Sequence, residues 1–484
     1  MPPKLTAQDE FDQGVMLQQQ GRNIDAMFAY QRAVLKKPNL HQAWANRGVL
    51  LSQCGNVFDA VLNYNQALSH DKNPEYYHNR GVAWSDLDAW EAAEKDYKTA
   101  IRLRPDLVSS PQMLGGLYIR LGRVNDALEA FEHGLAIDPK HVGCLLGKAI
   151  ANLTLGKLVE GFRDFESRWD CGQIVKRGLP VPAWNGEDLN GKTLLIYHEQ
   201  GHGDTIHFIR YAAAIKEKYP KCTIKAEVRL PLIRLIKTVP GVDQVFGYGE
   251  DHGHIDYGSA VISCARAMGT TMDTIPAPRQ YIRADQHLVE KWRKHLDQDV
   301  GHFNGRLVGI CWAGGSRPFQ PLANAIDQRR STQLQQWEPL ANVPGVIYVA
   351  LQAEEGILDQ VKSQRPTKMT VILPGGGKEP FEDFADTAAL IENLELVISV
   401  DTAVMHVAAA LGKPTWMLSR YDGCWRWHGD RPDSPWYPTL RQFRQHEPGS
   451  WGPVFSRVAD ELRKFVQTDY QPYHGYEPIV EAAE

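Results

Sequence analysis

The chain has no pair of cysteines at metal-ligand spacing, since its seven cysteines stand singly and no CxxC occurs. This distribution predicts reduced thiols in a cytoplasmic protein and no structural zinc. No run approaches about 18 apolar residues, and MPPKLTAQDE has no apolar stretch after its first charge. The sequence therefore predicts neither a membrane span nor a secretion signal. Positive charge is not in excess either, because 53 Lys and Arg face 58 Asp and Glu. The formal net charge of -5 gives no global attraction to nucleic acid or anionic lipid.

What is present is ordinary globular composition over a long chain. The 484 residues are 43% hydrophobic and 23% charged, which excludes a mainly disordered, collagen-like or coiled-coil protein. At about 150 residues per domain, the length predicts three domains.

An internal repeat occupies the first third of the chain. Three columns of residues recur at spacings of 34, 33, 34 and 34. The first holds small residues: Gly14, Gly48, Gly81, Gly115 and Ala149. The second also holds small residues: Ala26, Ala60, Ala93, Ala127 and Gly161. The third holds aromatic residues: Tyr30, Tyr64, Tyr97, Phe131 and Phe165. Prolines that cannot continue a helix follow: Pro38, Pro105 and Pro139, with Pro74 offset by two.

These columns resemble the tetratricopeptide repeat, a helix-turn-helix unit that stacks into an all-α solenoid. The resemblance implies about five repeats over residues 1–170, with a groove for a peptide or protein. A role as a packing or dimerisation arm stays open. In the fifth unit Arg168 replaces the small residue, and we expect GFRDFESRWD to cap the solenoid. Residues 171–192, rich in Pro and Gly, are predicted to be a linker.

From Thr193 onward, short apolar strands alternate with helical segments. The predicted strands are TLLIY, TIKAEV, DQVFGY, LVGICWAGG, VIYVALQ, MTVILP, ELVISV and PTWMLS. This alternation predicts an α/β region of two doubly wound, Rossmann-like domains, residues 193–300 and 301–470, joined near 285–306 and followed by a tail at 471–484. A ligand cleft is expected between them, at the carboxyl ends of the strands.

The turn Gly201–Thr205 lies between the first strand and its helix. Asp204 and Thr205 stand where a helix cap belongs, and the cap is the simplest interpretation. GxGxx is a weak dinucleotide fingerprint because Ile206 holds the third glycine position. HEQGH at 198–202 fits the zinc-peptidase pattern, but it crosses a strand end and a glycine turn, which removes the helical spacing of its histidines. We therefore expect no metal site.

A second turn, SVDTAVMH at 399–406, places Asp401 and Thr402 at the start of an apolar helix. The free N–H groups and positive end of that helix form an anion site that a diphosphate would fit. A simple Asp-Thr cap is the alternative.

Five segments of the chain together resemble a glycosyltransferase-like domain that follows tetratricopeptide repeats in bacterial and phage proteins. They are TLLIYHEQGHGDTIHFIRY, LVGICWAGG, Arg329-Arg330-Ser331, LELVISVDTAVMHVAAALGKPTWMLS and WRWHGDRPDSPWYPTLRQFRQ. That domain is similar to the lipopolysaccharide heptosyltransferases and has the GT-B fold, which implies a transferase using a nucleotide-sugar donor.

The resemblance also implies roles for individual residues. Asp204 corresponds to the catalytic base, and Arg330 to the basic residue that stabilises the donor phosphates, where heptosyltransferases have Lys. The donor-binding Asp-Thr-Gly segment corresponds to Asp401, Thr402 and Ala403, with Ala departing from Gly. His406 matches the histidine one turn into the helix.

Six further residues are assigned to the acceptor side or to loops: Gly201, His202, Gly203, Thr205, Trp425 and Arg426. Five of the thirteen tryptophans fall within 36 residues. Their rings either stack on substrate or build core and brace a long loop. Arg426 and Arg431 either reach phosphate or pair with Asp430 and Asp433.

The sequence thus predicts a metal-independent, inverting glycosyltransferase with a nucleotide-sugar co-substrate and no other cofactor. The acceptor stays open among protein, glycan and modified nucleobase, as do the sugar, the nucleotide and the oligomeric state. The alternative is a non-catalytic repeat scaffold with a degenerate nucleotide-binding domain.

Overall fold

The computed structural model describes residues 5–172, 174–315, 321–352, 356–377, 381–429 and 431–467. The tail predicted at 471–484 lies outside these residues. The chain divides into two compact units, Met1–Ala151 and Asn152–Glu484, which are described separately below.

The first unit consists of helices in consecutive pairs, which confirms the predicted repeat solenoid. Their bounds are α1 Ala7–Gln19, α2 Asn23–Lys36, α3 His41–Gln53, α4 Val57–His70, α5 Pro74–Asp86, α6 Trp90–Leu103, α7 Ser109–Arg120, α8 Val124–Ile137 and α9 Val142–Thr154. Pro38, Pro105 and Pro139 each come two residues after a helix ends, as expected. Pro74 instead begins α5, where its missing N–H costs no hydrogen bond.

The glycine and aromatic columns contact each other inside each repeat. A Cβ on Gly14 would lie 2.6 Å from Cε1 of Tyr30, and one on Gly115 would lie 2.6 Å from Cε1 of Phe131. The same approach is 2.8 Å at Gly48 with Tyr64 and 2.8 Å at Gly81 with Tyr97. Only glycine leaves room for the ring, so the 34-residue period records a packing requirement.

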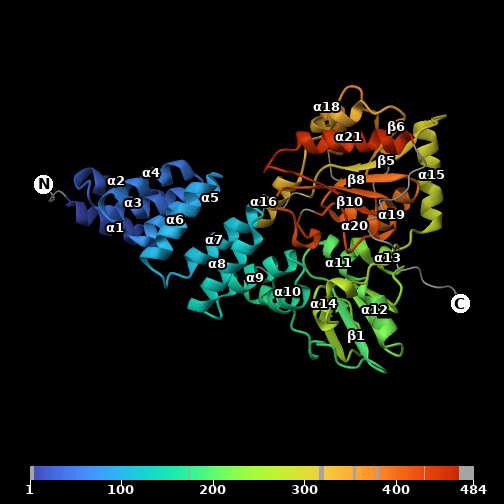
Figure 1. Cartoon of the computed structure of the whole chain (residues 1–484), viewed down its shortest axis with the longest axis horizontal. Helices are drawn as coiled ribbons and strands as arrows, with labels where there is room; N and C mark the ends of the chain where they lie inside the picture. Colours follow the sequence, from blue (N-terminus) through green and yellow to red (C-terminus); the bar gives the residue numbers. More distant parts are fainter. Residues whose placement is uncertain are drawn as a thin grey trace. The chain divides into compact units, whose positions relative to one another are not determined.

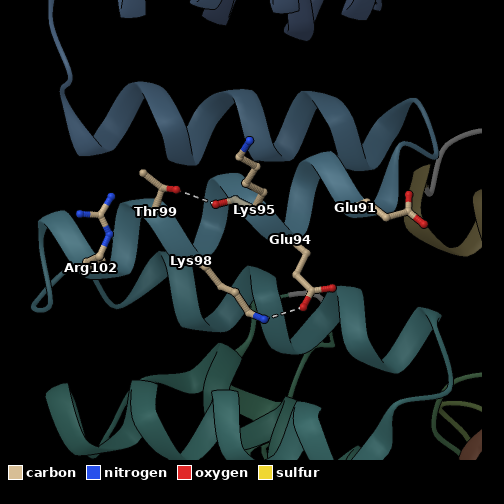
Figure 2. Close-up of a pocket in the computed structure, with 6 residues that line it drawn as sticks. All are labelled: Glu91, Glu94, Lys95, Lys98, Thr99 and Arg102. Atoms are coloured by element: carbon tan, nitrogen blue, oxygen red, sulfur yellow. Dashed lines mark hydrogen bonds and ion pairs between the residues drawn. The ribbon is translucent and has the colours of Figure 1, made fainter.

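The outer face of α6 holds a shallow hollow lined by both signs of charge (Figure 2). Lys98 pairs with Glu94 at 2.6 Å, and the Thr99 hydroxyl donates to the Lys95 carbonyl at 2.8 Å. None of the residues that line this hollow belongs to the predicted donor site.

The second unit contains two parallel sheets. The first has the order β3-β2-β1-β4, with β1 Thr193–Tyr197, β2 Thr223–Val228, β3 Gln244–Gly247 and β4 Tyr257–Ala260. Strands β1 to β3 fall where the sequence predicts them. The short β4, YGSA, was not predicted because its small residues carry no strand pattern.

The second sheet has the order β10-β9-β8-β5-β6-β7. Its strands are β5 Arg306–Cys311, β6 Val346–Ala350, β7 Val371–Ile372, β8 Leu396–Val400, β9 Thr415–Ser419 and β10 Leu440–Arg444. This is the order of a doubly wound nucleotide-binding fold, in which the direction of winding reverses between β5 and β8. Strand β10, LRQFR, was not predicted because it lies at the sheet edge and alternates polar with apolar residues.

Helices cover both faces of the second sheet (Figure 1), with α18 Ile357–Gln364 and α21 Gly452–Gln467 on one face and α19 Phe384–Glu392 and α20 Ala403–Ala410 on the other. The remaining α-helices of this unit are α10 Leu158–Asp164, α11 His202–Phe208, α12 Tyr211–Lys218, α13 Ile233–Ile236, α14 Ser263–Ala267, α15 Gln286–Val300, α16 Pro321–Arg330 and α17 Glu338–Ala341. The joint predicted near 285–306 is thus largely a helix, α15. The segment IHFIRYAAAIKEKY, predicted as one helix, is divided between α11 and α12.

The end of the repeat region belongs to the second unit, which begins at Asn152 rather than after residue 170. Arg168, in the 3-10 helix Phe165–Asp170, is buried and donates to both carboxylate oxygens of Glu199 at 2.7 and 3.0 Å. The predicted cap GFRDFESRWD is therefore held to the first sheet by this ion pair rather than only closing the solenoid. Among the described residues, no helix is both long and apolar enough to cross a membrane.

Candidate active site

Two strand-to-helix turns carry most of the predicted site residues. The first follows β1, where Gly201 is the N-cap of α11 and its N–H donates to Oδ2 of Asp204 at 2.9 Å. The second follows β8, where Thr402 is the N-cap of α20. Both turns lie at carboxyl ends of central parallel strands, which is where ligands bind in open α/β sheets.

The two turns pack against each other through Gly203. A Cβ on Gly203 would lie 2.8 Å from Cδ2 of His406 and 3.7 Å from Cα of Ala403. The glycine therefore allows α11 to approach the first turn of α20 closely. The structure thus brings the predicted base turn beside the predicted donor turn, although the two are 200 residues apart in sequence.

Helix α20 has an open N-terminus. In the described part of the chain, no side chain caps it, because the Thr402 hydroxyl lies 3.2 Å from the Ser399 hydroxyl instead. Its first N–H groups and the positive end of its dipole are available to an anion. This observation favours the anion-site interpretation of SVDTAVMH over a simple cap.

Asp401 is held from both its side chain and its backbone. Its Oδ2 accepts a hydrogen bond from Nε1 of Trp427 at 2.8 Å, and its carbonyl accepts one from Nη1 of Arg330 at 2.7 Å. Burial opposes ionisation of this carboxyl, but the Arg330 charge and the Trp427 hydrogen bond lower its pKa. Asp401 is therefore an anion that organises its neighbours.

Arg330 reaches the second turn from the end of α16. It forms an ion pair with Asp327, and its guanidinium packs over Gly314, where a Cβ would lie 2.8 Å from Nη2. Its side chain is 20% exposed, so the charge is accessible beside the β5 and β8 strand ends. The predicted proximity of Arg330 to Asp401 is present in the structure.

His406 is buried one turn into α20. Its Nδ1 lies 2.8 Å from the Tyr437 hydroxyl, and its ring stacks on Trp427 with centroids 5.7 Å apart. Burial, with Arg426 and Arg210 nearby, lowers the pKa of His406 to about 3 despite the opposing charge of Asp401. The ring is therefore neutral at neutral pH, and it positions Trp427 and Tyr437 rather than supplying charge to a phosphate.

Arg426 contacts Asp204 directly. One of its Nη2 hydrogens is donated to Oδ1 of Asp204, and its Nη1 lies 3.0 Å from Sγ of Cys424. The predicted pairing of Arg431 with a nearby aspartate is present, since Arg431 binds Asp433 at 2.6 Å. Asp430 lies outside the described residues.

The five tryptophans are buried, which favours the interpretation that they build core and brace a loop over the one that they stack on substrate. Trp425 is 6% exposed and packs edge-on against Phe162 at 5.7 Å. The other four are also buried: Trp416, Trp427, Trp436 and Trp451.

The HEQGH segment does not form a metal-binding helix. Gln200 has a φ of 58°, and α11 begins only at His202. Glu199 is committed to Arg168, and the His202 ring packs against Phe384 at 5.3 Å. Burial, together with Arg229, lowers the pKa of His202. Thr205 is buried in the same helix.

Sequence reasoning missed Arg210, which connects the two halves of this unit. Its fully buried guanidinium donates to the carbonyls of His207 and Trp436 and to the Tyr281 hydroxyl, the last at 3.0 Å. A charged residue within the apolar stretch IHFIRYAAA was the available signal, because such a charge needs partners when its helix is buried.

Two family models match this chain. Residues 350–448 match glycosyltransferase family 9 (heptosyltransferase), and residues 112–141 match the tetratricopeptide repeat. These matches identify a tetratricopeptide repeat at residues 112–141 and a glycosyltransferase family 9 domain at residues 350–448. The matched segment contains Asp401, His406 and Arg426, whereas Asp204 and Arg330 lie before it.

Individual relatives extend this result. The chain is 27% identical to Protein FlbA of Caulobacter vibrioides over 391 residues, which cover 76% of this chain and 63% of FlbA. The chain thus spans less than two thirds of that relative. It is also 33% identical over 79 residues to the Hsp70-Hsp90 organizing protein of Triticum aestivum, covering 16% of this chain and 14% of that protein. Among solved structures, the MamA protein matches 36% of this chain and 98% of its own, at 21% identity and a TM-score of 0.32.

Proposed function

We propose that this protein transfers a sugar from a nucleotide-diphosphate sugar to an acceptor hydroxyl or amine by a single displacement. One observation carries the proposal: Gly203 allows the turn with Asp204 to pack against the first turn of α20, where Arg330, Asp401 and open N–H groups gather. A base and an anion site thereby lie side by side at the carboxyl ends of two parallel sheets.

In the proposed reaction, Asp204 takes the acceptor proton as the acceptor atom attacks the anomeric carbon. The bond from that carbon to the diphosphate oxygen breaks on the opposite side, and its electron pair leaves with the diphosphate. Attack from the opposite side inverts the anomeric centre. A positioned base and fixed positive groups at the departing charge are the two contributions that lower such a barrier.

The departing diphosphate would bind at the N-terminus of α20. Arg330 supplies a guanidinium whose paired N–H groups suit phosphate, and the helix supplies N–H groups and a favourable dipole. These groups offset the charge without calling on a metal. Ala403 stands where heptosyltransferases have Gly, and its methyl group limits how closely the donor diphosphate can approach the backbone there. The donor would therefore contact the turn through Thr402 and the following amides.

The repeats would select the acceptor or a partner protein through their groove. We propose a protein acceptor first, because joining a peptide-binding solenoid to a transferase brings substrate and catalyst into one chain. A glycan or a modified nucleobase is the alternative acceptor. A cytoplasmic location is part of the same proposal.

A thermal-shift screen tests the donor site. The purified chain is heated with UDP-, GDP-, ADP-, CMP- and dTDP-sugars, with and without EDTA. A donor at 100 times its dissociation constant should stabilise the fold by about 2.7 kcal/mol. Stabilisation by one nucleotide class, unchanged by EDTA and lost in Arg330→Ala, supports the proposal. No shift with any of them would favour a non-catalytic scaffold.

Turnover tests the base. With the donor found in the screen, Asp204→Asn should lower kcat by about 100-fold or more, since general base catalysis contributes about that factor. Full turnover in Asp204→Asn at saturating donor would assign the base to another group.

A further inference from the structure

The short helix Trp425–Trp427 connects the proposed base to the proposed donor site. Arg426 pairs with Asp204, and the next residue, Trp427, donates to Asp401 and stacks on His406. On the other side, Trp425 packs against Phe162. The backbone of this segment is therefore anchored at both ends, while the Arg426 side chain lies between two anionic positions.

The ion pair engages the Asp204 carboxylate in the donor-free protein. Oδ1 is paired with Arg426 and Oδ2 accepts the Gly201 N–H at 2.9 Å, so an acceptor hydroxyl must share these oxygens with donors already in place. Both side chains are only partly accessible, at 19% for Asp204 and 10% for Arg426. Because little solvent screens such a pair, an anion that replaces the carboxylate favours its opening.

A diphosphate is that anion. It carries more charge than a carboxylate and accepts paired hydrogen bonds from guanidinium, so it competes well for an arginine. The Nε of Arg426 is buried, with no hydrogen-bond partner in the part of the chain that the structure describes, and one further donor is therefore in place for such a ligand.

We propose that Arg426 exchanges between Asp204 and the donor diphosphate, so that donor binding frees the base. This inference rests on the proposed function. In the donor-free protein, Arg426 holds Oδ1 of Asp204 and blocks the approach of an acceptor to that oxygen. When the donor occupies the α20 N-terminus, the guanidinium turns to the diphosphate, and Asp204 is released toward the acceptor. Base activity would then follow donor binding, and Arg426 would both bind the diphosphate and control the position of Asp204.

Calorimetric titration of the full chain with UDP, GDP, ADP and dTDP, each beside its nucleoside, tests the exchange. Because binding linkage is reciprocal, removing the competing carboxylate should strengthen diphosphate binding. Asp204→Asn should bind the diphosphate about tenfold more tightly than the wild type, while keeping an oxygen for the Gly201 N–H. Arg426→Gln should bind it about tenfold more weakly, and Arg426→Lys should recover part of that loss. Nucleoside affinity should change in none of them.

The double variant Asp204→Asn/Arg426→Gln gives the decisive comparison. It should bind the diphosphate as weakly as Arg426→Gln alone, because the gain from Asp204→Asn acts only through Arg426. Kinetically, Asp204→Asn should lower both kcat and donor KM, whereas Arg426→Gln should lower kcat and raise donor KM. Unchanged or weaker diphosphate binding by Asp204→Asn would overturn the exchange. If no nucleoside diphosphate binds the wild type, the proposed function fails instead.

Discussion

Gly203 and His406 lie so close that a single methyl group on the glycine would come within 2.8 Å of the imidazole Cδ2. Gly203 belongs to α11, which follows a strand of the first sheet, and His406 belongs to α20, which follows a strand of the second. Their contact fixes how near the proposed base can come to the proposed diphosphate site. It is a contact between backbone and ring, which leaves little freedom for adjustment.

Gly203→Ala should therefore separate the two turns. Overpacking of this kind costs about 1 to 3 kcal/mol, and here the displaced element carries Asp204. We expect a lower melting temperature and at least a tenfold weaker affinity for the nucleotide. Thermal shift measures both, the second from the nucleotide concentration that is needed for stabilisation. Gly178→Ala is the matched control, because a Cβ there meets nothing within 4 Å. Wild-type nucleotide stabilisation in Gly203→Ala would contradict the close approach.

The close contact between glycine and aromatic ring in each repeat can be tested with two variants of one helix. Gly115→Ala would force a methyl group to 2.6 Å from Phe131, whereas a Cβ on the neighbouring Gly116 meets nothing within 4 Å. We expect Gly115→Ala to destabilise the protein by about 1 to 3 kcal/mol. Gly116→Ala should stabilise it by about 0.5 to 1 kcal/mol, since alanine is the better helix former. Urea unfolding of both variants measures the difference, and equal midpoints would refute the idea that Gly115 is required for the packing of Phe131.

Removal of one partner from the buried pair of Arg168 and Glu199 should strongly destabilise the folded protein. Arg168→Met leaves Glu199 buried and unpaired, and such changes cost about 3 to 5 kcal/mol. Arg163→Met is the control, because Arg163 is 64% exposed and its loss should stay within about 0.5 kcal/mol. Arg168→Met/Glu199→Leu should recover much of the stability. Equal urea midpoints for the two single variants would show that Arg168 is dispensable.

Acid should destabilise the protein through its buried histidines. Burial lowers the pKa of His406 to about 3, while an unfolded histidine titrates near about 6.5. Between these values the unfolded chain binds more protons, so stability is complete above about pH 6.5 and is lost as the pH falls toward 3. Burial also lowers the pKa of His198 and of His428 to about 4, which acts in the same direction.

His406→Asn should make the protein less sensitive to acid. Between pH 7 and pH 5 it should lose about 2 kcal/mol less unfolding free energy than the wild type, from about 1.4 kcal/mol for each pH unit below the unfolded pKa. His254→Asn, whose parent side chain is 78% exposed, should keep the wild-type slope. Urea titrations at the two pH values decide, and parallel slopes in His406→Asn would show that the ring protonates freely in the folded state.

Much of the fold could be predicted because its signals are local. The repeats are marked by a contact inside each 34-residue unit, between Gly14 and Tyr30 for example, so the sequence repeats whenever the contact does. The strands β1, β2 and β8 are short apolar runs that end in turns. Strands β4 and β10 and helix α15 escaped prediction because small or polar residues dominate them.

The site was predictable only to the level of its turns. Sequence and resemblance selected Asp204, Arg330 and Asp401, but they did not reveal that Arg426 binds Asp204, from which it is separated by 222 positions along the chain. Partners such as Tyr437 for His406 and Trp427 for Asp401 are likewise set by how the two sheets pack. No spacing rule carries that information. The boundaries of the Rossmann-like domains stay predictions.

The ring that fills each repeat comes from the same repeat as the glycine that admits it. The fit of Gly14, Gly48, Gly81 and Gly115 to their rings is therefore internal to each repeat, although the Phe131 ring also contacts the next unit, where a Cβ on Gly147 would collide with its Cε1. Loss or duplication of one such module would leave the fit between glycine and ring inside each remaining repeat unchanged. The number of repeats, and with it the length of surface offered to a partner, can thus change in evolution without any change in the transferase.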